Sequence, residues 1–399
     1  NVTREDAIEN IDIGGPTMLR AAAKNWQDVA VIIDPADYAT VLAELKADGN
    51  TTRETRMRLA AKVYTHTALY DSCIAAYLRP QAGLEEKLFL NYDLAQSLRY
   101  GENPHQQATF YRSTEEVPYS LAFAKQLGGK ELSYNNIQDA NATLAIVAEF
   151  DECFCVGVKH MNPCGAAIAD SPAEAWAKVY EADNVSIYGG IVAFNREVDA
   201  ATAEAMRPVF LEIVMAPSFT EEALEIFGKK KNLRVLQVPM YKRTKPEMQY
   251  TSVRGGLLAQ EFDDKMVTIT DEMTVTKRHP SAEELVDMNF GWRIVKYVKS
   301  NAIVVVKNGC TVGVGPGQTN RVGSAEIALK SAAEKGFTEG LVLASDGFLP
   351  FDDTVKAVAA AGVTAIVQPG GSIRDEDSIV AADELGVSML FTGIRHFKH

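Results

Sequence analysis

The sequence has no apolar run long enough to span a membrane and no excess of positive charge. Its 399 residues include 40 Lys and Arg against 53 Asp and Glu, a formal net charge of −13 at pH 7. Because a nucleic-acid backbone is bound by a basic face, this balance argues against nucleic acid as the main partner. We therefore expect small-molecule ligands and no membrane partner, with local basic pockets for anionic groups.

Cysteine is also scarce, and its pattern does not suit a disulfide framework. The five cysteines are an odd number in a long chain, and no C-x-x-C pair occurs. Buried thiols in a reducing compartment fit this pattern better, so we expect a cytoplasmic protein. The first residues contain neither a signal-peptide core nor an initiator methionine, and we expect a truncated N-terminus.

Apolar residues make up 47% of the chain, enough for large cores, and we expect two or three domains. Short apolar runs alternate with helical patterns, which predicts an α/β fold. In the first 90 residues we predict a Gly-Gly turn before a helix, a strand over 29–33 and a long helix over 52–78.

The most informative stretch is an apolar run over 153–158 that ends in Lys159, His160 and an Asn-Pro turn. We predict a buried strand whose end carries the basic pair, at the place where α/β proteins hold their chemistry. A neighbouring ammonium disfavours the imidazolium form, so the ring of His160 is available to accept a proton, while Lys159 can stabilise a developing oxyanion. The alternative is a loop histidine beside a solvated lysine.

An internal duplication organises the second half of the chain. Residues from about 140 to 240 and from about 285 to 393 show the same predicted order: helix, two-strand hairpin, helix, strand, helix, strand, helix and a closing strand. This order predicts two homologous α/β domains, each with a largely parallel sheet covered by helices on both faces. The helix that opens the first copy is predicted over 140–150.

Other candidate ligand contacts lie in polar loops. Arg99 and Tyr100 stand together in a loop rich in turn formers, where an arginine beside an aromatic ring suits a phosphate and a base. In the second copy a G-x-G-x-G run suits close approach of the backbone to a ligand, and Arg321, at a predicted helix start, is expected to clamp a phosphate. Asn301 and Phe348 are predicted at strand ends, where Phe348 is either a core residue or a wall for an aromatic ligand. By itself the basic C-terminal tail is typical of a solvated segment.

The predicted order of elements is also that of the cytidine-deaminase-like fold. Zinc deaminases carry P-C-x-x-C and H-x-E motifs. Here Pro163-Cys164 has no second cysteine three residues on, and His160 has no glutamate two residues on. We therefore expect no zinc and no metal site, even if the architecture is shared.

Several motifs together resemble the bifunctional purine-biosynthesis family that joins AICAR transformylase to IMP cyclohydrolase. The resemblance covers about Asn91 to His399 for the transformylase, and residues 1 to about 90 are similar to the end of the cyclohydrolase domain. The motifs that carry it are SLRYGENPHQQ, GKELSYNNIQDAN, VKHMNPCGAAI, YGGIVAFN, VKSNAIVVVKNG, GVGPGQTNRVGSA, SDGFLPFDD, QPGGSIRDED, FTGIRHFKH and, for the cyclohydrolase, IDIGGPTMLRAAAKN and YTHTALYD.

This resemblance implies formyl transfer from 10-formyltetrahydrofolate to the 5-amino group of AICAR, with Lys159 and His160 as the catalytic pair. It implies two tandem cytidine-deaminase-like α/β/α domains, over 91–260 and 261–399, after a C-terminal remnant of a Rossmann-like cyclohydrolase domain over 1–90. It also implies a homodimer whose sites combine residues of both subunits, and a monovalent cation as a further requirement. The implied substrate contacts are Arg99, Tyr100, Gly189, Glu212 (an aspartate in the family), Asn301, Arg321, Phe348, Arg395 and His399.

Asp12 and Lys24 match cyclohydrolase positions, and the resemblance implies that the other residues of that site precede Asn1. Three interpretations stay open. The chain is a formyltransferase, or a cyclohydrolase if the natural protein has those preceding residues, or a catalytically inactive nucleotide-binding module.

Overall fold

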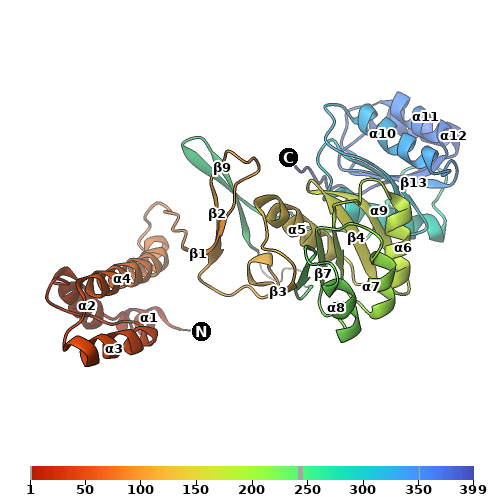
Figure 1. Cartoon of the computed structure of the whole chain (residues 1–399). Helices are drawn as coiled ribbons and strands as arrows, with labels where there is room; N and C mark the ends of the chain where they lie inside the picture. Colours follow the sequence, from red (N-terminus) through yellow and green to blue (C-terminus); the bar gives the residue numbers. More distant parts are fainter. Residues whose placement is uncertain (1, 241–245, 350) are drawn as a thin grey trace. The chain divides into compact units, whose positions relative to one another are not determined.

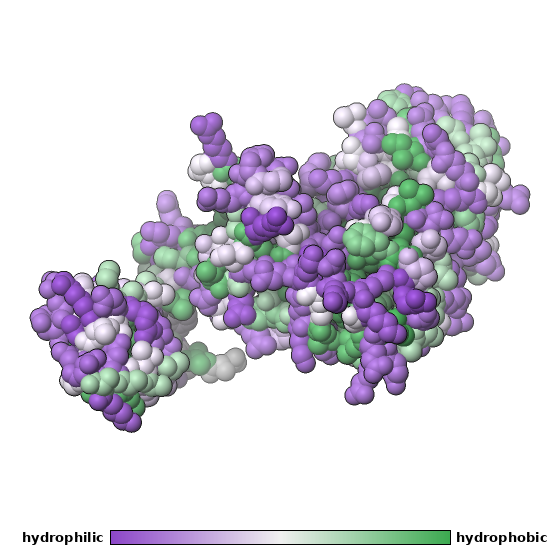
Figure 2. Space-filling model, viewed as in Figure 1, coloured by the Kyte–Doolittle hydropathy of each residue, from purple (hydrophilic) through white to green (hydrophobic). Residues whose placement is uncertain are grey.

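The computed structural model describes residues 2–240, 246–349 and 351–399, and the chain divides into two compact units, Asn1–Asp93 and Leu94–His399 (Figure 1). Within those ranges no helix is both long and apolar enough to cross a membrane. Hydrophilic side chains cover most of the visible face of each unit (Figure 2). Each unit has a hydrophobic core of its own.

The first unit is helical. α2 (Gly14–Lys24) packs against α4 (Arg53–Gln81) around the buried Ala23 and Val63. α4 begins where the sequence predicts a helix, because the hydroxyl of Thr52 accepts the backbone N–H of Thr55 as an N-cap. The remaining elements are α1 (Arg4–Glu9), the short 3₁₀-helix η1 (Pro35–Asp37) and α3 (Tyr38–Asp48).

The predicted strand over 29–33 is wrong. These residues have no β-pairing, and Val31 packs instead into the core between α2 and α4. A strand must pair its backbone groups with a neighbouring strand. The described residues before Tyr92 contain no strand with which 29–33 could pair. The apolar run is therefore a connection that covers the helical core.

The second unit is built on one mixed sheet of eleven strands in the order β15-β14-β13-β11-β12-β5-β4-β6-β7-β8-β3. The strands are β3 (Lys125–Gly128), β4 (Phe154–Lys159), β5 (Asn162–Ile168), β6 (Ile191–Phe194), β7 (Ile213–Ala216), β8 (Arg234–Gln237), β11 (Ile303–Lys307), β12 (Cys310–Gly315), β13 (Leu341–Ser345), β14 (Val363–Gln368) and β15 (Ser388–Phe391). Two further ribbons pair β1 (Tyr92–Leu98) with β2 (Ala108–Ser113), and β9 (Met248–Val253) with β10 (Gly256–Glu261).

The helices of this unit are α5 (Tyr134–Val147), α6 (Pro172–Ala182), α7 (Ala200–Met206), α8 (Glu221–Gly228), α9 (Ala282–Val295), α10 (Arg321–Glu334), α11 (Asp352–Ala360) and α12 (Asp375–Leu385), with short 3₁₀-helices η2 (Leu121–Phe123) and η3 (Asp271–Met273). The predicted helix over 140–150 is placed too late along the chain. Ser133 and Asn136 form a capping box, so α5 begins at Tyr134 and ends at Val147.

The predicted repeat of elements is present, and the α/β prediction is confirmed. The first copy runs from α5 through the β4–β5 hairpin to α8 and β8, and the second runs in the same order from α9 through the β11–β12 hairpin to α12 and β15. Both hairpins have a register shift at the same place, between Gly157 and Val158 and between Val305 and Val306. The two copies therefore share the irregularity in their hairpins as well as the order of their elements.

Helices cover both faces of the sheet, and the two faces differ. α5 and α9 cover one face, over a single core that crosses both copies and contains Phe154, Val304 and Trp292. The other face has one core for each copy, under α6, α7 and α8 in the first and α10, α11 and α12 in the second. One face thus has a core common to both copies, whereas on the other face each copy has its own core, with Cys310 of the second copy packed against that of the first.

The strand directions bring most candidate residues to one edge of the sheet. β5 pairs antiparallel with β12, β4 with β5 and β6, and β11 with β12 and β13, whereas β6, β7 and β8 are parallel to one another, as are β13, β14 and β15. It follows that β4, β12, β13, β14 and β15 end at the edge where β5, β6, β7, β8 and β11 begin. We call this the site edge, since Lys159, His160, Gly189, Glu212, Asn301, Arg321, Phe348, Arg395 and His399 all lie next to these strand ends.

Gly313 in β12 marks a close approach between sheet and helix. A Cβ at this residue would meet the backbone carbonyl oxygen of Ala328 in α10. Gly313→Ala should therefore lower the free energy of unfolding by roughly 1 to 3 kcal/mol, because relieving the overlap moves backbone against backbone. Gly228→Ala, at the end of α8, is the control, since nothing lies within 4 Å of the added Cβ. Equal urea midpoints for the two variants would contradict the close approach.

Candidate active site

Lys159 and His160 stand at a tight hairpin turn on the site edge. Lys159 pairs with Asn162, so His160 and Met161 are the two central residues, with φ of 52° and 63°. Positive φ at both central residues defines a type I′ turn, which connects antiparallel strands with the correct twist but disfavours residues other than Gly, Asn and Asp. His160 is exposed at the tip of this turn.

The second copy has the same turn with different residues. Lys307 pairs with Cys310, and the central residues are Asn308 and Gly309, with φ of 53° and 66°. Asn-Gly is the pair that a type I′ turn prefers. The first copy instead has a histidine and a methionine in the left-handed region, so its turn sequence is not explained by turn formation alone. Non-glycine residues held in this region are concentrated at functional sites.

The lysines of the two turns are alike, in contrast to their central residues. The Nζ of Lys159 donates to the carbonyl oxygen of Tyr188 at 2.7 Å, and the Nζ of Lys307 donates to that of Gly340 at 2.7 Å. Each bond ties a hairpin turn to the segment before the next strand. The lysine is thus a common feature of the repeat, whereas His160 is particular to the first copy.

Gly189 and Glu212 lie beside the Lys159 turn. Gly189 follows Tyr188, has a φ of 72°, and donates its N–H to the carbonyl oxygen of Phe210 at 2.8 Å. Positive φ favours glycine here. The carboxylate of Glu212 accepts from the Arg234 guanidinium at 2.6 Å. The structure therefore brings Lys159, Gly189 and Glu212 to adjacent strand ends, with Glu212 already paired.

Asn301 and Arg321 form a buried polar group in the second copy. The Arg321 guanidinium donates to the Asn301 side-chain oxygen at 2.8 Å and to the Ser345 hydroxyl at 3.0 Å, and it forms an ion pair with Asp346. Arg321 is 8% exposed and Asp346 is fully buried. The guanidinium is therefore engaged inside the protein, where it fixes the side chain of Asn301.

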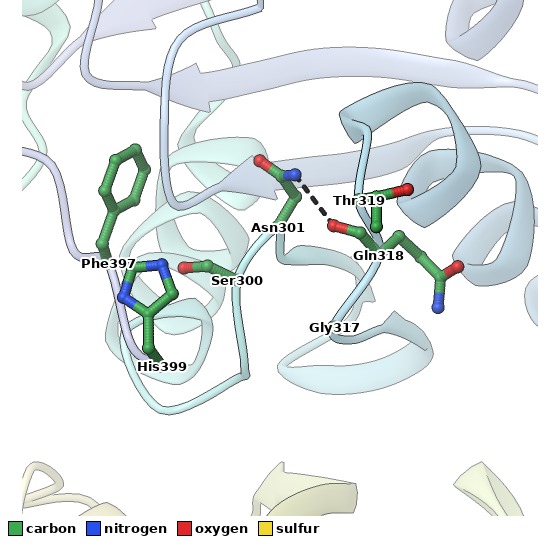
Figure 3. A pocket seen from close by; sticks show the side chains of 7 residues that line it. All are labelled: Ser300, Asn301, Gly317, Gln318, Thr319, Phe397 and His399. Carbon is green, nitrogen blue, oxygen red and sulfur yellow. Dashed lines mark hydrogen bonds between the residues drawn. The ribbon is translucent and has the colours of Figure 1, made fainter. Parts of the chain in front are cut away.

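A cavity of about 290 Å³ lies beside Asn301 (Figure 3). Figure 3 shows Asn301 between Gln318 and Thr319 on one side and Ser300, Phe397 and His399 on the other. The Asn301 amide donates to the carbonyl oxygen of Gln318 at 2.8 Å, which leaves its orientation fixed from both ends. The cavity has the concave shape and mixed lining of a small-ligand site.

The C-terminal tail is docked onto the second copy, and it is not the solvated segment that its composition alone suggests. His396 is 1% exposed, its ring lies 4.9 Å from that of Trp292, and its Nδ1 lies 2.6 Å from the Asp263 carboxylate. The backbone of Lys398 exchanges hydrogen bonds with Ser300. His396 was not among the predicted residues, and only its place between the implied contacts Arg395 and His399 could have indicated it.

The two copies meet at the site edge. The backbone N–H of Lys299 donates to the side-chain oxygen of Asn162 at 3.1 Å. Asn162 directly follows the His160 turn, and Lys299 lies two residues before Asn301. One hydrogen bond thus connects the catalytic candidates of the first copy to the cavity of the second.

The other predicted contacts are mostly exposed, and two of the predicted site residues lie in the first unit. The Arg99 guanidinium is exposed and lies 5.7 Å from the centroid of the Tyr100 ring, and Arg395 lies 4.6 Å from that of Phe397. Phe348 is 41% exposed. In the first unit Asp12 precedes α2 and Lys24 ends it, so about three turns of helix separate these two exposed residues. The structure does not bring Asp12 and Lys24 together.

Cys164 lies in β5, and its thiol donates to the carbonyl oxygen of Gly157 at 3.3 Å. Burial raises the pKa of its thiol to about 12, so the group is a neutral thiol near pH 7. Across 2–240, 246–349 and 351–399, no group of three or more His, Cys, Asp or Glu side chains is arranged to hold a metal ion.

The fold is an α/β sheet made of two copies of one unit, and most of the candidate site residues lie at one edge of it. The chain matches the model of the family described as AICARFT/IMPCHase bienzyme over residues 22–331. Proteins named bifunctional purine biosynthesis protein PurH, from Bacillus thuringiensis (strain Al Hakam), Bacillus cereus (strain 03BB102) and Bacillus anthracis, are each 57% identical over 404 residues, covering 100% of this chain and 78% of each relative.

The chain belongs to the AICARFT/IMPCHase bienzyme family. It is therefore an enzyme of purine biosynthesis, from the family that combines AICAR formyltransferase with IMP cyclohydrolase activity. The first activity implies a folate as formyl donor.

The docked tail predicts a pH dependence of stability. Burial, with a smaller effect of Lys299, lowers the pKa of Lys398 from 10.5 to about 8. Between these values the unfolded chain binds more protons than the folded protein, so the contribution of Lys398 to stability rises as pH increases through this window. We expect the difference in unfolding midpoint between the wild type and Lys398→Met to move in favour of the wild type from pH 8 to pH 10.5. A difference independent of pH would contradict the buried ammonium.

Proposed function

We propose that the site edge transfers a formyl group from 10-formyltetrahydrofolate to the 5-amino group of AICAR, giving formyl-AICAR. The observation that carries this proposal is the His160 turn, where an exposed histidine occupies a position that the duplicate copy gives to asparagine. The hydrogen bond between Asn162 and Lys299, which ties this turn to the segment beside the Asn301 cavity, supports the proposal further.

In the proposed reaction the amine nitrogen of AICAR bonds to the formyl carbon, and the bond from that carbon to N10 of the folate breaks. The ring of His160 accepts the amine proton, and N10 takes up a proton as tetrahydrofolate leaves. Lys159 stabilises the oxyanion that forms on the formyl oxygen. The folate is a substrate here, and the chain's own residues supply the proton transfer and the charge.

We assign the remaining contacts to the nucleotide. The fixed amide of Asn301 and the ring of Phe348 face the ligand, and Arg321 acts by holding Asn301. The proposed contacts are Arg99, Tyr100, Gly189, Glu212, Asn301, Phe348, Arg395 and His399, with Arg321 as the residue that positions Asn301. Asp12 and Lys24 are proposed as positions of the cyclohydrolase activity.

We further propose the division into 1–90, 91–260 and 261–399, action in the cytoplasm, and a requirement for a monovalent cation. The repeat of elements supports the last two parts of this division. The five free cysteines support a reducing compartment.

The requirement for a monovalent cation is tested by measuring formyl transfer in potassium chloride and in tetramethylammonium chloride. Equal rates in the two salts would reject it.

His160→Ala should lower the rate of formyl transfer by roughly 100- to 10,000-fold, because it removes a positioned general base. Nucleotide affinity, measured by calorimetry, should change little. Release of tetrahydrofolate and of IMP is followed separately, so that formyl transfer, ring closure and an inactive binding module are distinguished. Asn308→Ala, at the matching turn position of the second copy, is the control. A near-wild-type rate for His160→Ala would reject its assignment as the base.

We also propose a homodimer with sites at the subunit interface. Both two-stranded ribbons are largely exposed, with Leu94 at 60% and Leu258 at 61%, and an isolated ribbon is marginally stable in water. A partner that covers them removes this apolar surface from water. Sedimentation equilibrium should give twice the mass of 43.5 kDa, and a mass of one chain at assay concentration would reject the dimer.

A further inference from the structure

The carboxylate of Asp139 lies under the His160 turn. Asp139, in α5, accepts the backbone N–H of Met161 at 2.8 Å. Its pKa is raised by burial, an effect opposed by the backbone N–H groups of Met161 and His160 and by the charge of His160. The carboxylate therefore holds the backbone of Met161, the second of the two turn residues that have positive φ.

The second copy has an equivalent aspartate under its hairpin turn. Asp287, in α9, accepts the backbone N–H of Asn308 at 2.9 Å and of Gly309 at 2.6 Å. Asp139 and Asp287 occupy the same position counted from the serine that caps each helix, and the same number of residues separates each from its turn. An aspartate under the hairpin is thus part of the repeated architecture.

The two turns depend on this carboxylate to different degrees. Asn308 and Gly309 adopt positive φ readily, so their turn forms with or without added support. In His160 and Met161 the side chain makes positive φ sterically unfavourable. This conformation persists only when the surrounding structure holds it. The first copy therefore relies on Asp139 to keep the turn that carries its histidine.

We propose that Asp139 is a positioning residue, whose carboxylate binds the backbone N–H of Met161, keeps the turn in the left-handed conformation and so presents the His160 ring to substrate. This inference rests on the proposed function, because it concerns the base assigned there. It assigns no proton transfer to Asp139 itself.

The first test is Asp139→Asn, with Asp287→Asn as the matched control in the other copy. Both variants lose a charged acceptor beneath a hairpin, so both should unfold at lower denaturant concentration. Only Asp139→Asn should lower kcat, by about 10- to 100-fold as expected for a misplaced reacting group, with the KM for the nucleotide unchanged. Equal kcat losses in the two variants, or none in Asp139→Asn, would overturn the proposal.

The second test is rescue by glycine. Met161→Gly removes the steric cost of positive φ, as Gly309 does in the second copy, so the double variant Asp139→Asn, Met161→Gly should recover most of the lost kcat. A folded but unrescued double variant would overturn the proposal, and this test applies even if Asp139→Asn alone does not fold.

His160→Ala in the same assay separates this inference from the proposed function. If His160→Ala is inactive and Asp139→Asn is fully active, only the positioning role fails. If His160→Ala itself retains the wild-type rate, the assignment of the base fails, and the role of Asp139 fails with it.

Discussion

The antiparallel contact between β5 and β12 is the constraint on which the site depends. Ala167 pairs with Cys310, the N–H of Ile168 donates to the carbonyl oxygen of Gly309 at 2.9 Å, and the buried Thr311 hydroxyl accepts the N–H of Ala166 at 2.9 Å. This pairing makes one sheet of two copies and sets their relative direction. As a result the hairpin turn between β4 and β5 lies at the same edge as the start of β11 and the end of β12. Residues of both copies therefore lie at this edge.

Duplication explains both the common framework and the difference between the copies. Each copy has an aspartate in its first helix and a lysine at its hairpin turn, and these make matching contacts with backbone groups. The copies differ at the central turn residues, where the second keeps a pair suited to the turn and the first has His160 and Met161. A stable framework thus tolerates a strained turn in one copy, and that turn contains His160, the proposed base.

Much of this arrangement could be predicted from the sequence, because it depends on local patterns. Apolar runs and helix caps indicate the elements of both copies, and Lys159 and His160 stand at a strand end as expected. Long-range pairing could not be predicted in the same way. No periodicity reveals that β5 meets β12, that Arg321 is buried against Asp346, or that the basic tail docks through His396. The predicted strand over 29–33 is wrong for the same reason, because an apolar run forms a strand only where another strand is available to pair with it.

The central claim is that both copies contribute to one site at the site edge. A crystal structure of the protein with AICAR bound tests it most directly. The account predicts ligand density between the His160 turn and the Asn301 cavity, in contact with residues of both copies. Density at the opposite edge, in the cavity of about 460 Å³ beside Asn308 and Gly309, or contacts confined to one copy, would contradict it.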